Sequence, residues 1–143
     1  MLEIRNCLLV VLIIGVTSVN AAEDYVIPTG VTVLTEEQLL NKIIGSTLIG
    51  GSGRWRAYFI PSSGDQKKGK FKGRSMNGPT SGGWTVNGEL MCWYFDQVTL
   101  SSYSGCFTTK LDGDTVKWYL PSGHPRYSPG GRMSLISGNP ENF

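Results

Sequence analysis

After Gly45, no stretch of the chain repeats the helical period, and this absence constrains the fold more than any other feature of the sequence. Glycine or proline interrupts the chain at short intervals, and the 143 residues include 19 glycines and 7 prolines. The pattern favours short antiparallel strands joined by turns, because parallel strands would need long crossover connections for which the chain has no room.

Strand-forming runs alternate with turn residues along this region. The favoured hairpin dipeptide Asn87-Gly88 and the turn Asp112-Gly113-Asp114 each reverse the chain between two such runs. Since a series of hairpins protects its edges by closing on itself, we expect a mainly β fold, a small antiparallel β-barrel or sandwich of six to eight strands. The predicted strands cover residues 54–61, 67–74, 84–86, 89–96, 101–111, 115–121 and 133–137, with a loop at 77–83.

One short N-terminal helix is predicted at residues 36–44. Thr35 is suited to cap it, and Gln38 completes a capping box three residues later. Leu39 and Ile43 belong to a single apolar stripe, and Gly45 follows the last turn as a typical helix-ending glycine. The helix is therefore expected to cover an open end or one face of the sheet.

The first residues of the chain have the pattern of an export signal. An apolar run of ten residues at 7–16 follows Arg5 and precedes Val19-Asn20-Ala21, which is typical of a signal peptidase site. The run is too short to span a membrane as a helix, which takes about 20 residues. The sequence predicts a signal peptide at 1–21, a flexible lead-in at 22–33 and one domain at 34–143, exported to the periplasm or secreted.

Two cysteines remain once the signal peptide is removed. Cys92 and Cys106 lie symmetrically about position 99, inside an expected connection at 97–100. Two strands joined there would place the cysteines opposite each other. A structural disulfide is therefore predicted, rather than a metal site or a redox pair, because the chain has no CxxC motif.

The residues that could support catalysis are few. His124 is the single histidine of the chain, and it lies in the loop sequence Ser-Gly-His-Pro without a GxSxG elbow elsewhere. Asp112 and Asp114 could form a carboxylate pair, but their D-G-D sequence first indicates a turn. The sequence predicts a protein that is not an enzyme, with no catalytic residue, no metal and no cofactor.

Positive charge is concentrated in one predicted hairpin. Between Arg54 and Arg74 the chain has seven basic residues and one acidic residue, whereas the net charge of the whole chain is +2. Alternating cations would share one face of the second strand, and they predict a contact for a polyanion such as a phosphate-bearing glycolipid, nucleic acid or an acidic protein. Specific nucleic-acid binding is not predicted, because the sequence has no helix-turn-helix, zinc or RNP-type motif. Alternatively, these lysines protect an edge strand. The candidate binding residues are Lys68, Lys70, Lys72 and Arg74, with Trp55 and Tyr58 beside them.

Aromatic and apolar residues occupy both faces of the cysteine strand. Met91, Trp93 and Phe95 alternate with Cys92 and Tyr94, as in a barrel wall that touches the core on one side. Such residues could line a ligand pocket or fill the interior of a small barrel.

Several short motifs follow one another along residues 34 to 142. They are Leu34-Thr35-x-x-Gln38-Leu39, Gly45-x-Thr47, Tyr58-Phe59 before Gly64, Gly83-Trp84-x-Val86, Gly88-x-Leu90-x-Cys92-Trp93, Cys106, Gly113-Asp114, Tyr119 and Gly138-Asn139-Pro140. Their order resembles a family of small exported bacterial proteins of unknown function. The resemblance implies an exported location and a small disulfide-bearing β-barrel after a short helix, and it implies no catalytic residue. The sequence departs from the family pattern in its lysine-rich hairpin and in Trp93 directly after Cys92.

These features together predict a non-catalytic exported binding module that holds a small ligand or a partner protein. It could be lipocalin-like, with an apolar ligand, or inhibitor-like, with a loop at 122–131 entering the cleft of a secreted hydrolase. The alternative is a cell-envelope structural protein attached to anionic lipid or polysaccharide through the basic hairpin.

Overall fold

A computed structural model describes residues 25–123, 125–126 and 133–143. The predicted signal peptide lies outside the described residues, and so do His124 and most of the loop at 122–131. Within the described residues, no helix is long and apolar enough to cross a membrane.

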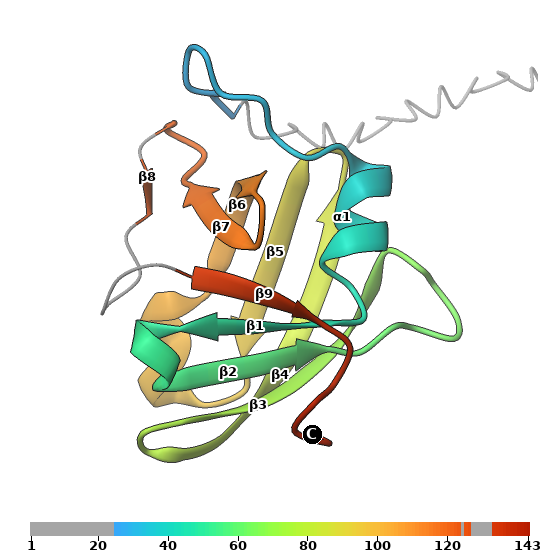
Figure 1. Cartoon of the computed structure of the whole chain (residues 1–143), viewed down its shortest axis with the longest axis vertical. Helices are drawn as coiled ribbons and strands as arrows, with labels where there is room; N and C mark the ends of the chain where they lie inside the picture. Colours follow the sequence, from blue (N-terminus) through green and yellow to red (C-terminus); the bar gives the residue numbers. More distant parts are fainter. Residues whose placement is uncertain (1–24, 124, 127–132) are drawn as a thin grey trace, which may run out of the picture.

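The described chain forms one short α-helix, nine strands and two 3-10 helices. The helix α1 precedes the first strand, and the 3-10 helices η1 and η2 lie in connections between strands (Figure 1). The elements are α1 (Glu36–Lys42), β1 (Ser46–Gly50), η1 (Gly51–Gly53), β2 (Trp55–Phe59), β3 (Lys68–Ser75), β4 (Gly78–Asn87), β5 (Leu90–Phe95), η2 (Val98–Tyr103), β6 (Gly105–Asp112), β7 (Thr115–Tyr119), β8 (Pro125–Arg126) and β9 (Met133–Ser137).

The strands close into an eight-stranded antiparallel barrel. From β1 to β7 each strand pairs with the next in the chain, and β9 closes the ring by pairing with both β7 and β1. The two-residue strand β8 adds to β7 outside this ring. The mainly β fold with one short helix is thus confirmed, and the barrel rather than the sandwich is the architecture.

The capping box that the sequence predicts for the helix is present. The Thr35 hydroxyl accepts a hydrogen bond from the Gln38 amide at 3.3 Å, and the Gln38 side chain accepts one from the Thr35 amide at 3.0 Å. The helix ends at Lys42 rather than at residue 44, because the backbone turns into β1: Gly45, at a φ of 84°, donates its N–H to the Phe59 carbonyl at 2.8 Å. Ile43 remains fully buried.

The segment before α1 runs along the barrel from Tyr25 onward. Val26 donates its N–H to the Pro121 carbonyl at 2.8 Å, and Leu34 donates to Thr109 at 2.7 Å. The Tyr25 hydroxyl donates to Glu89 at 2.9 Å, and this bond to a carboxylate raises the pKa of Tyr25. The segment and α1 therefore lie at the end of the barrel where β4 turns into β5 (Figure 1).

In three further places the elements differ from the prediction. Residues 46–50 form β1, which was not predicted; its side chains do not alternate between buried and exposed, since Ser46, Thr47 and Leu48 are all buried. The loop predicted at 77–83 is wrong, since β4 begins at Gly78 and pairs with β3 from Gly78 to Thr85. The strand predicted from residue 101 begins at Gly105, because η2 occupies the preceding residues.

Glycines on β3 and β4 make room for aromatic rings inside the barrel. A Cβ on Gly82 would lie 2.6 Å from the Phe71 ring and 1.9 Å from the Tyr94 carbonyl oxygen, and one on Gly69 would lie 2.7 Å from the Trp84 ring. Within the glycine-rich sequence 78–83, Gly82 is thus covered by the Phe71 ring of the neighbouring strand β3, which is one reason why this sequence is a strand in this protein.

Aromatic rings in mutual contact form the core. The Trp93 ring centroid lies 4.4 Å from that of Trp118 and 4.6 Å from that of Phe107, and Phe59 and Phe71 extend the cluster at 5.7 Å from each other. The interior positions of the barrel wall are thus occupied by tightly packed side chains, as expected for a barrel of eight strands.

Candidate functional site

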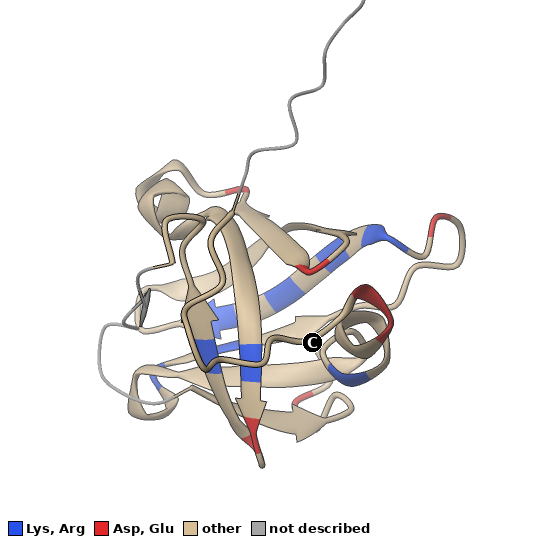
Figure 2. Ribbon diagram, turned by 90° about the horizontal axis from the view of Figure 1, so that it is seen from above, with Lys and Arg blue, Asp and Glu red and all other residues tan. Residues whose placement is uncertain are grey.

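The alternating cations of β3 all lie on the outer face of the barrel. The intervening residues Phe71 and Gly73 are buried, so the period of two directs the charged side chains to solvent. Figure 2 shows the basic positions spaced along this strand. The exposed cations are Lys68, Lys70, Lys72 and Arg74.

Strand β3 is not an edge strand. Its residues pair with β2 on one side and with β4 on the other, and the β3–β4 pairing runs from Lys68 to Ser75. The interpretation of the lysines as protection of an exposed edge is therefore wrong, because the backbone groups of β3 are already paired on both sides.

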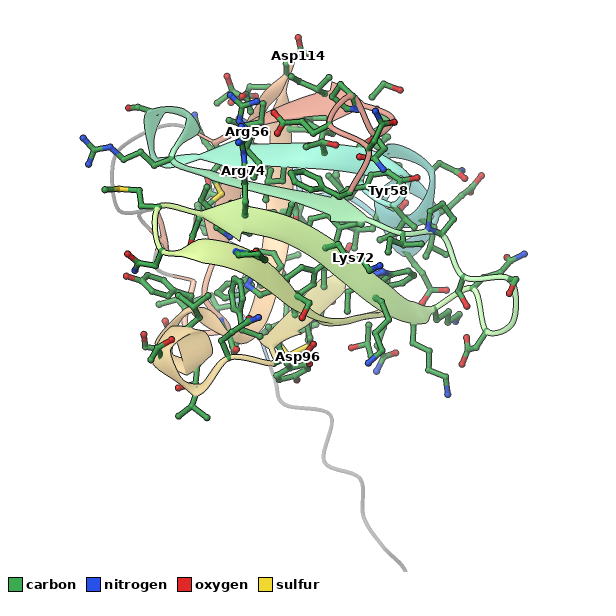
Figure 3. The ribbon with its side chains drawn as sticks, turned by 90° about the horizontal axis from the view of Figure 1, so that it is seen from below. Arg56, Tyr58, Lys72, Arg74, Asp96 and Asp114 are labelled. Carbon is green, nitrogen blue, oxygen red and sulfur yellow. A yellow bond between two sulfur atoms is a disulfide. The ribbon has the colours of Figure 1, made fainter. Side chains whose placement is uncertain are left out.

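Strand β2 adds two residues to this surface. Tyr58 lies directly opposite Lys72, and Arg56 lies directly opposite Arg74 (Figure 3). Side chains that face each other across an antiparallel pair are immediate neighbours. We call this surface the basic face, and it consists of Arg56, Tyr58, Lys68, Lys70, Lys72 and Arg74.

Trp55 does not join the basic face, although it was predicted beside it. It shares the inward side of β2 with Ala57 and Phe59, which are buried. Its ring contacts Phe95 edge-on at 6.3 Å between centroids. The structure thus brings Tyr58 to the cations and turns Trp55 toward the core, since adjacent strand residues point to opposite faces.

Carboxylates offset part of the positive charge at the two ends of the basic face. Near one end, Lys68 pairs with Asp65 at 3.5 Å. At the other end, Arg56 and Arg74 both pair with Glu141, whose distance to Arg74 is 3.1 Å.

The centre of the basic face has no such neutralisation. Lys70 and Lys72 form no ion pair with any of the described residues. Two of the uncompensated positive charges of the face therefore lie side by side at these two lysines.

The residues of β4 beside these two lysines are small. Gly83 lies opposite Lys70, and Ser81 lies opposite Lys72. The Ser81 hydroxyl donates to Asp96 at 2.7 Å, which holds this carboxylate on the β4 side of the face (Figure 3). No large side chain of β4 thus stands between either ammonium group and solvent.

The hairpin that joins β2 and β3 holds its one carboxylate, Asp65, ionised. The backbone N–H of Lys67 donates to Asp65 at 2.9 Å, and this bond, together with Lys68, lowers the pKa of Asp65. Asp65 therefore offsets part of the charge of Lys68 at ordinary pH, whereas Lys70 and Lys72 have no such partner among the described residues.

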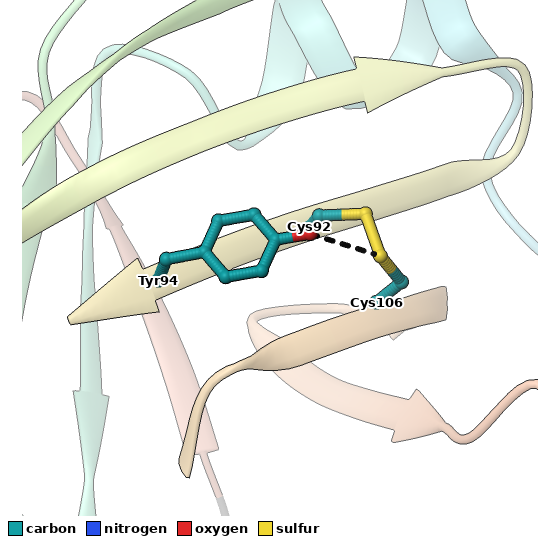
Figure 4. Close-up of a disulfide and its surroundings, with 3 residues drawn as sticks. All are labelled: Cys92, Tyr94 and Cys106. Carbon is teal, nitrogen blue, oxygen red and sulfur yellow. Dashed lines mark hydrogen bonds between the residues drawn. A yellow bond between two sulfur atoms is a disulfide. The ribbon is translucent and has the colours of Figure 1, made fainter. Parts of the chain in front are cut away.

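The predicted disulfide is confirmed. Cys92 on β5 lies directly opposite Cys106 on β6 with 3.9 Å between their Cα atoms, and the two sulfurs are bonded (Figure 4). The Tyr94 hydroxyl lies 3.6 Å from the Cys106 sulfur, on the outer side of the barrel wall. The bond fastens β5 to β6, two strands away from the basic face.

The other acidic candidates have structural partners. Asp112 pairs with Lys110 at 3.2 Å and with Lys117 at 3.1 Å, and the hydrogen bonds from these two lysines lower the pKa of Asp112. The Asp114 carbonyl accepts the N–H of Leu135 in the predicted turn between β6 and β7. In the described ranges, no three His, Cys, Asp or Glu side chains are grouped to hold a metal ion.

Sequence reasoning missed Glu141 as part of this surface. The residue belongs to the segment after β9, and nothing near it in the sequence indicates that it meets β2 and β3. The hydrogen bond from the Gly138 N–H to the Gly45 carbonyl, at 3.0 Å, directs the segment back across the barrel.

Comparisons with known proteins give no relative for this chain. No family model matches it, and neither a curated protein nor a solved structure does. The resemblance to a family of small exported bacterial proteins thus stays a prediction, and the function has to be argued from the geometry alone.

Proposed function

We propose that this protein is a non-catalytic, exported binding module that contacts an anionic partner through the basic face. One observation carries the proposal: Lys70 and Lys72 are exposed, adjacent on one strand face and without a carboxylate partner among the described residues. With β3 paired on both sides, protection of a sheet edge no longer accounts for them.

The spacing of the cations supports a partner with repeated negative charge. Alternate residues of a strand lie about 7 Å apart, so several cations of β3 can contact neighbouring charges of one surface or polymer. Lysine ammonium groups are compact, strongly hydrated charges on flexible stems. They suit an anionic lipid surface or an acidic envelope polysaccharide better than a narrow pocket.

The packed interior also favours contact through the outer face. Trp84, Trp118 and Phe107 are almost fully buried inside the barrel wall, so ring contacts take the place that an apolar ligand would have in a lipocalin-like protein. Inhibition of a secreted hydrolase through the loop at 122–131 stays a prediction, since most of that loop lies outside the described residues.

Co-sedimentation with lipid vesicles tests the proposal. The double variant Lys70→Gln/Lys72→Gln should bind vesicles of phosphatidylcholine and phosphatidylglycerol about tenfold to thirtyfold more weakly than the unchanged protein, because each basic residue near an anionic surface contributes about 1 kcal/mol. Added salt should weaken the binding of the unchanged protein, since exposed charges are screened.

A matched control separates the basic face from net charge. Lys110→Gln/Lys117→Gln removes the same charge from β6 and β7, where both lysines pair with Asp112, and it should bind as the unchanged protein does. Equal losses of vesicle affinity in both double variants would mean that the net charge of the protein, and not the basic face, accounts for the binding. Unchanged binding of Lys70→Gln/Lys72→Gln would overturn the proposal.

A further inference from the structure

Arg56 and Arg74 hold one carboxylate between them. Arg56 contacts one oxygen of Glu141, and Arg74 contacts the other oxygen at 3.1 Å. The Glu141 side chain is 18% exposed, whereas that of Arg74 is 58% exposed. The carboxylate is thus enclosed by guanidinium groups that themselves reach solvent, an arrangement that also fits the oxygens of a phosphate.

The segment that carries Glu141 has few other polar contacts with the barrel. Gly138 is fastened, because its carbonyl accepts from the Thr47 hydroxyl at 2.7 Å. Beyond it, the Asn139 side chain bonds with both the N–H and the carbonyl of Phe143, so these hydrogen bonds lie within the segment. In the part of the chain that the structure describes, the ion pairs of Glu141 are the polar contacts that tie residues 139–143 to β2 and β3.

We propose that Arg56 and Arg74 form an oxyanion-binding site that Glu141 occupies as an internal ligand, and that a phosphate group competes with Glu141 for the two guanidinium groups. The inference rests on the proposed function, and it adds phosphate as the chemical class that the basic face takes. Lys72 lies two residues from Arg74 on the same strand face, so a phosphate held by the arginines also meets the uncompensated centre of the face.

Charge gives the competition its direction. With Glu141 in place, the two arginines and the carboxylate have a net charge of one, because the carboxylate cancels one guanidinium. When Glu141 is displaced, the ligand interacts with the full positive charge of both guanidinium groups. By linkage, a ligand that displaces the segment must bind more weakly while Glu141 competes and more tightly when the competitor is removed.

The substitution Glu141→Gln tests this, since it keeps the size of the side chain and removes its charge. The variant should bind vesicles containing phosphatidylglycerol about fivefold to tenfold more tightly than the unchanged protein, at the lower end of couplings between sites. Asp112→Asn is the matched control: it removes one carboxylate that also pairs with two cations, on β6 and β7. Its affinity should stay close to that of the unchanged protein.

Inorganic pyrophosphate distinguishes the source of the phosphate. If the site recognises the phosphate group itself, Glu141→Gln also binds pyrophosphate more tightly in calorimetry, and adding pyrophosphate to the unchanged protein shifts the amide NMR signals of Asn139 and of residues 141–143. If only the vesicle affinity rises, the phosphate of a lipid headgroup is the ligand. Either result supports the site.

Two results would overturn the inference and are distinct from failure of the proposed function. The first is that Glu141→Gln and the unchanged protein both bind vesicles measurably and with the same affinity. The second is an equal gain in Asp112→Asn. If neither the unchanged protein nor Glu141→Gln binds vesicles or pyrophosphate, the proposed function itself fails.

Discussion

Glu36 fastens α1 to the barrel through both of its carboxylate oxygens. One oxygen accepts the N–H of Gly88, in the turn between β4 and β5, at 2.9 Å. The other pairs with the ammonium group of Lys67 at 2.7 Å. The helix dipole alone would favour an acidic residue in the first turn, and Glu36 also has two partners from elsewhere in the chain. The contacts with these partners lower the pKa of Glu36.

The stability contributed by Glu36 should depend on pH. Because its pKa is lower in the folded protein than in the unfolded chain, the contribution is present above the unfolded pKa and is lost as the pH falls through the folded pKa. Glu36→Gln should therefore melt at a lower temperature than the unchanged protein near neutral pH, and the difference should vanish in strong acid. Thermal melts across an acid pH series measure it.

Glu37→Gln is the control for this prediction. Glu37 lies on the same helical turn and is exposed, so it experiences the helix dipole without the contacts of Glu36. Its variant should show a smaller pH dependence. If Glu37→Gln lowered the melting temperature by as much as Glu36→Gln, the dipole rather than the contacts with Gly88 and Lys67 would be responsible.

At the scale of elements, the disulfide joins β5 and β6 across the connection that contains η2. Cys92 and Cys106 are separated by 14 positions, and both side chains lie on the outer side of the barrel wall, away from Met91 and Trp93, which are buried. Loss of the bond therefore removes a constraint on the unfolded chain more than it removes packing.

We expect Cys92→Ala/Cys106→Ala to lower the free energy of unfolding by about 2–4 kcal/mol, as for a disulfide that closes a loop of this size. Urea unfolding monitored by tryptophan fluorescence measures the difference. Vesicle binding by the folded variant should not change, because the basic face is formed by β2 and β3. Equal unfolding midpoints of the variant and the oxidised protein would contradict the expectation, and so would alkylation of the unreduced protein.

At the scale of the whole molecule, β9 decides that the sheet is closed. Leu135 of β9 pairs with Leu48 of β1, and Met133 pairs with Val116 of β7. The first strand of the barrel and its seventh thus acquire a common neighbour, so neither is left as an exposed edge. Leu48 is fully buried at this closure.

Leu48→Ala should lower the free energy of unfolding by about 2–5 kcal/mol, because it leaves a cavity in the packed core where β1 meets β9. Ile136→Ala is the matched control on the facing strand: Ile136 is 42% exposed on the outer side, and its truncation should cost less than about 1 kcal/mol. Urea unfolding of both variants checks the prediction. A similar loss of unfolding free energy in both variants would contradict it, since the inner and outer faces of the β1–β9 pairing would then contribute equally to stability.

Local patterns in the sequence determined much of this protein. The capping residues predicted the start of α1, the alternation in β3 predicted that its cations share one face, and the symmetry of Cys92 and Cys106 predicted their bond. Each of these depends on residues close in sequence or on a single hairpin, where backbone geometry alone sets which side chains are neighbours.

The tertiary structure alone decided the rest. Strand β1 is a strand because β2 and β9 pair with it on both sides. The glycine-rich start of β4 is a strand because it pairs with β3 and the Phe71 ring covers Gly82, and in neither case is the partner visible within the segment itself. Glu141 meets Arg56 and Arg74 because closure by β9 returns the chain across β2. Such long-range contacts determine which cations have a carboxylate partner. The sequence therefore determined the total charge of the basic face, whereas the closed barrel decided which of its cations have no ion-pair partner among the described residues.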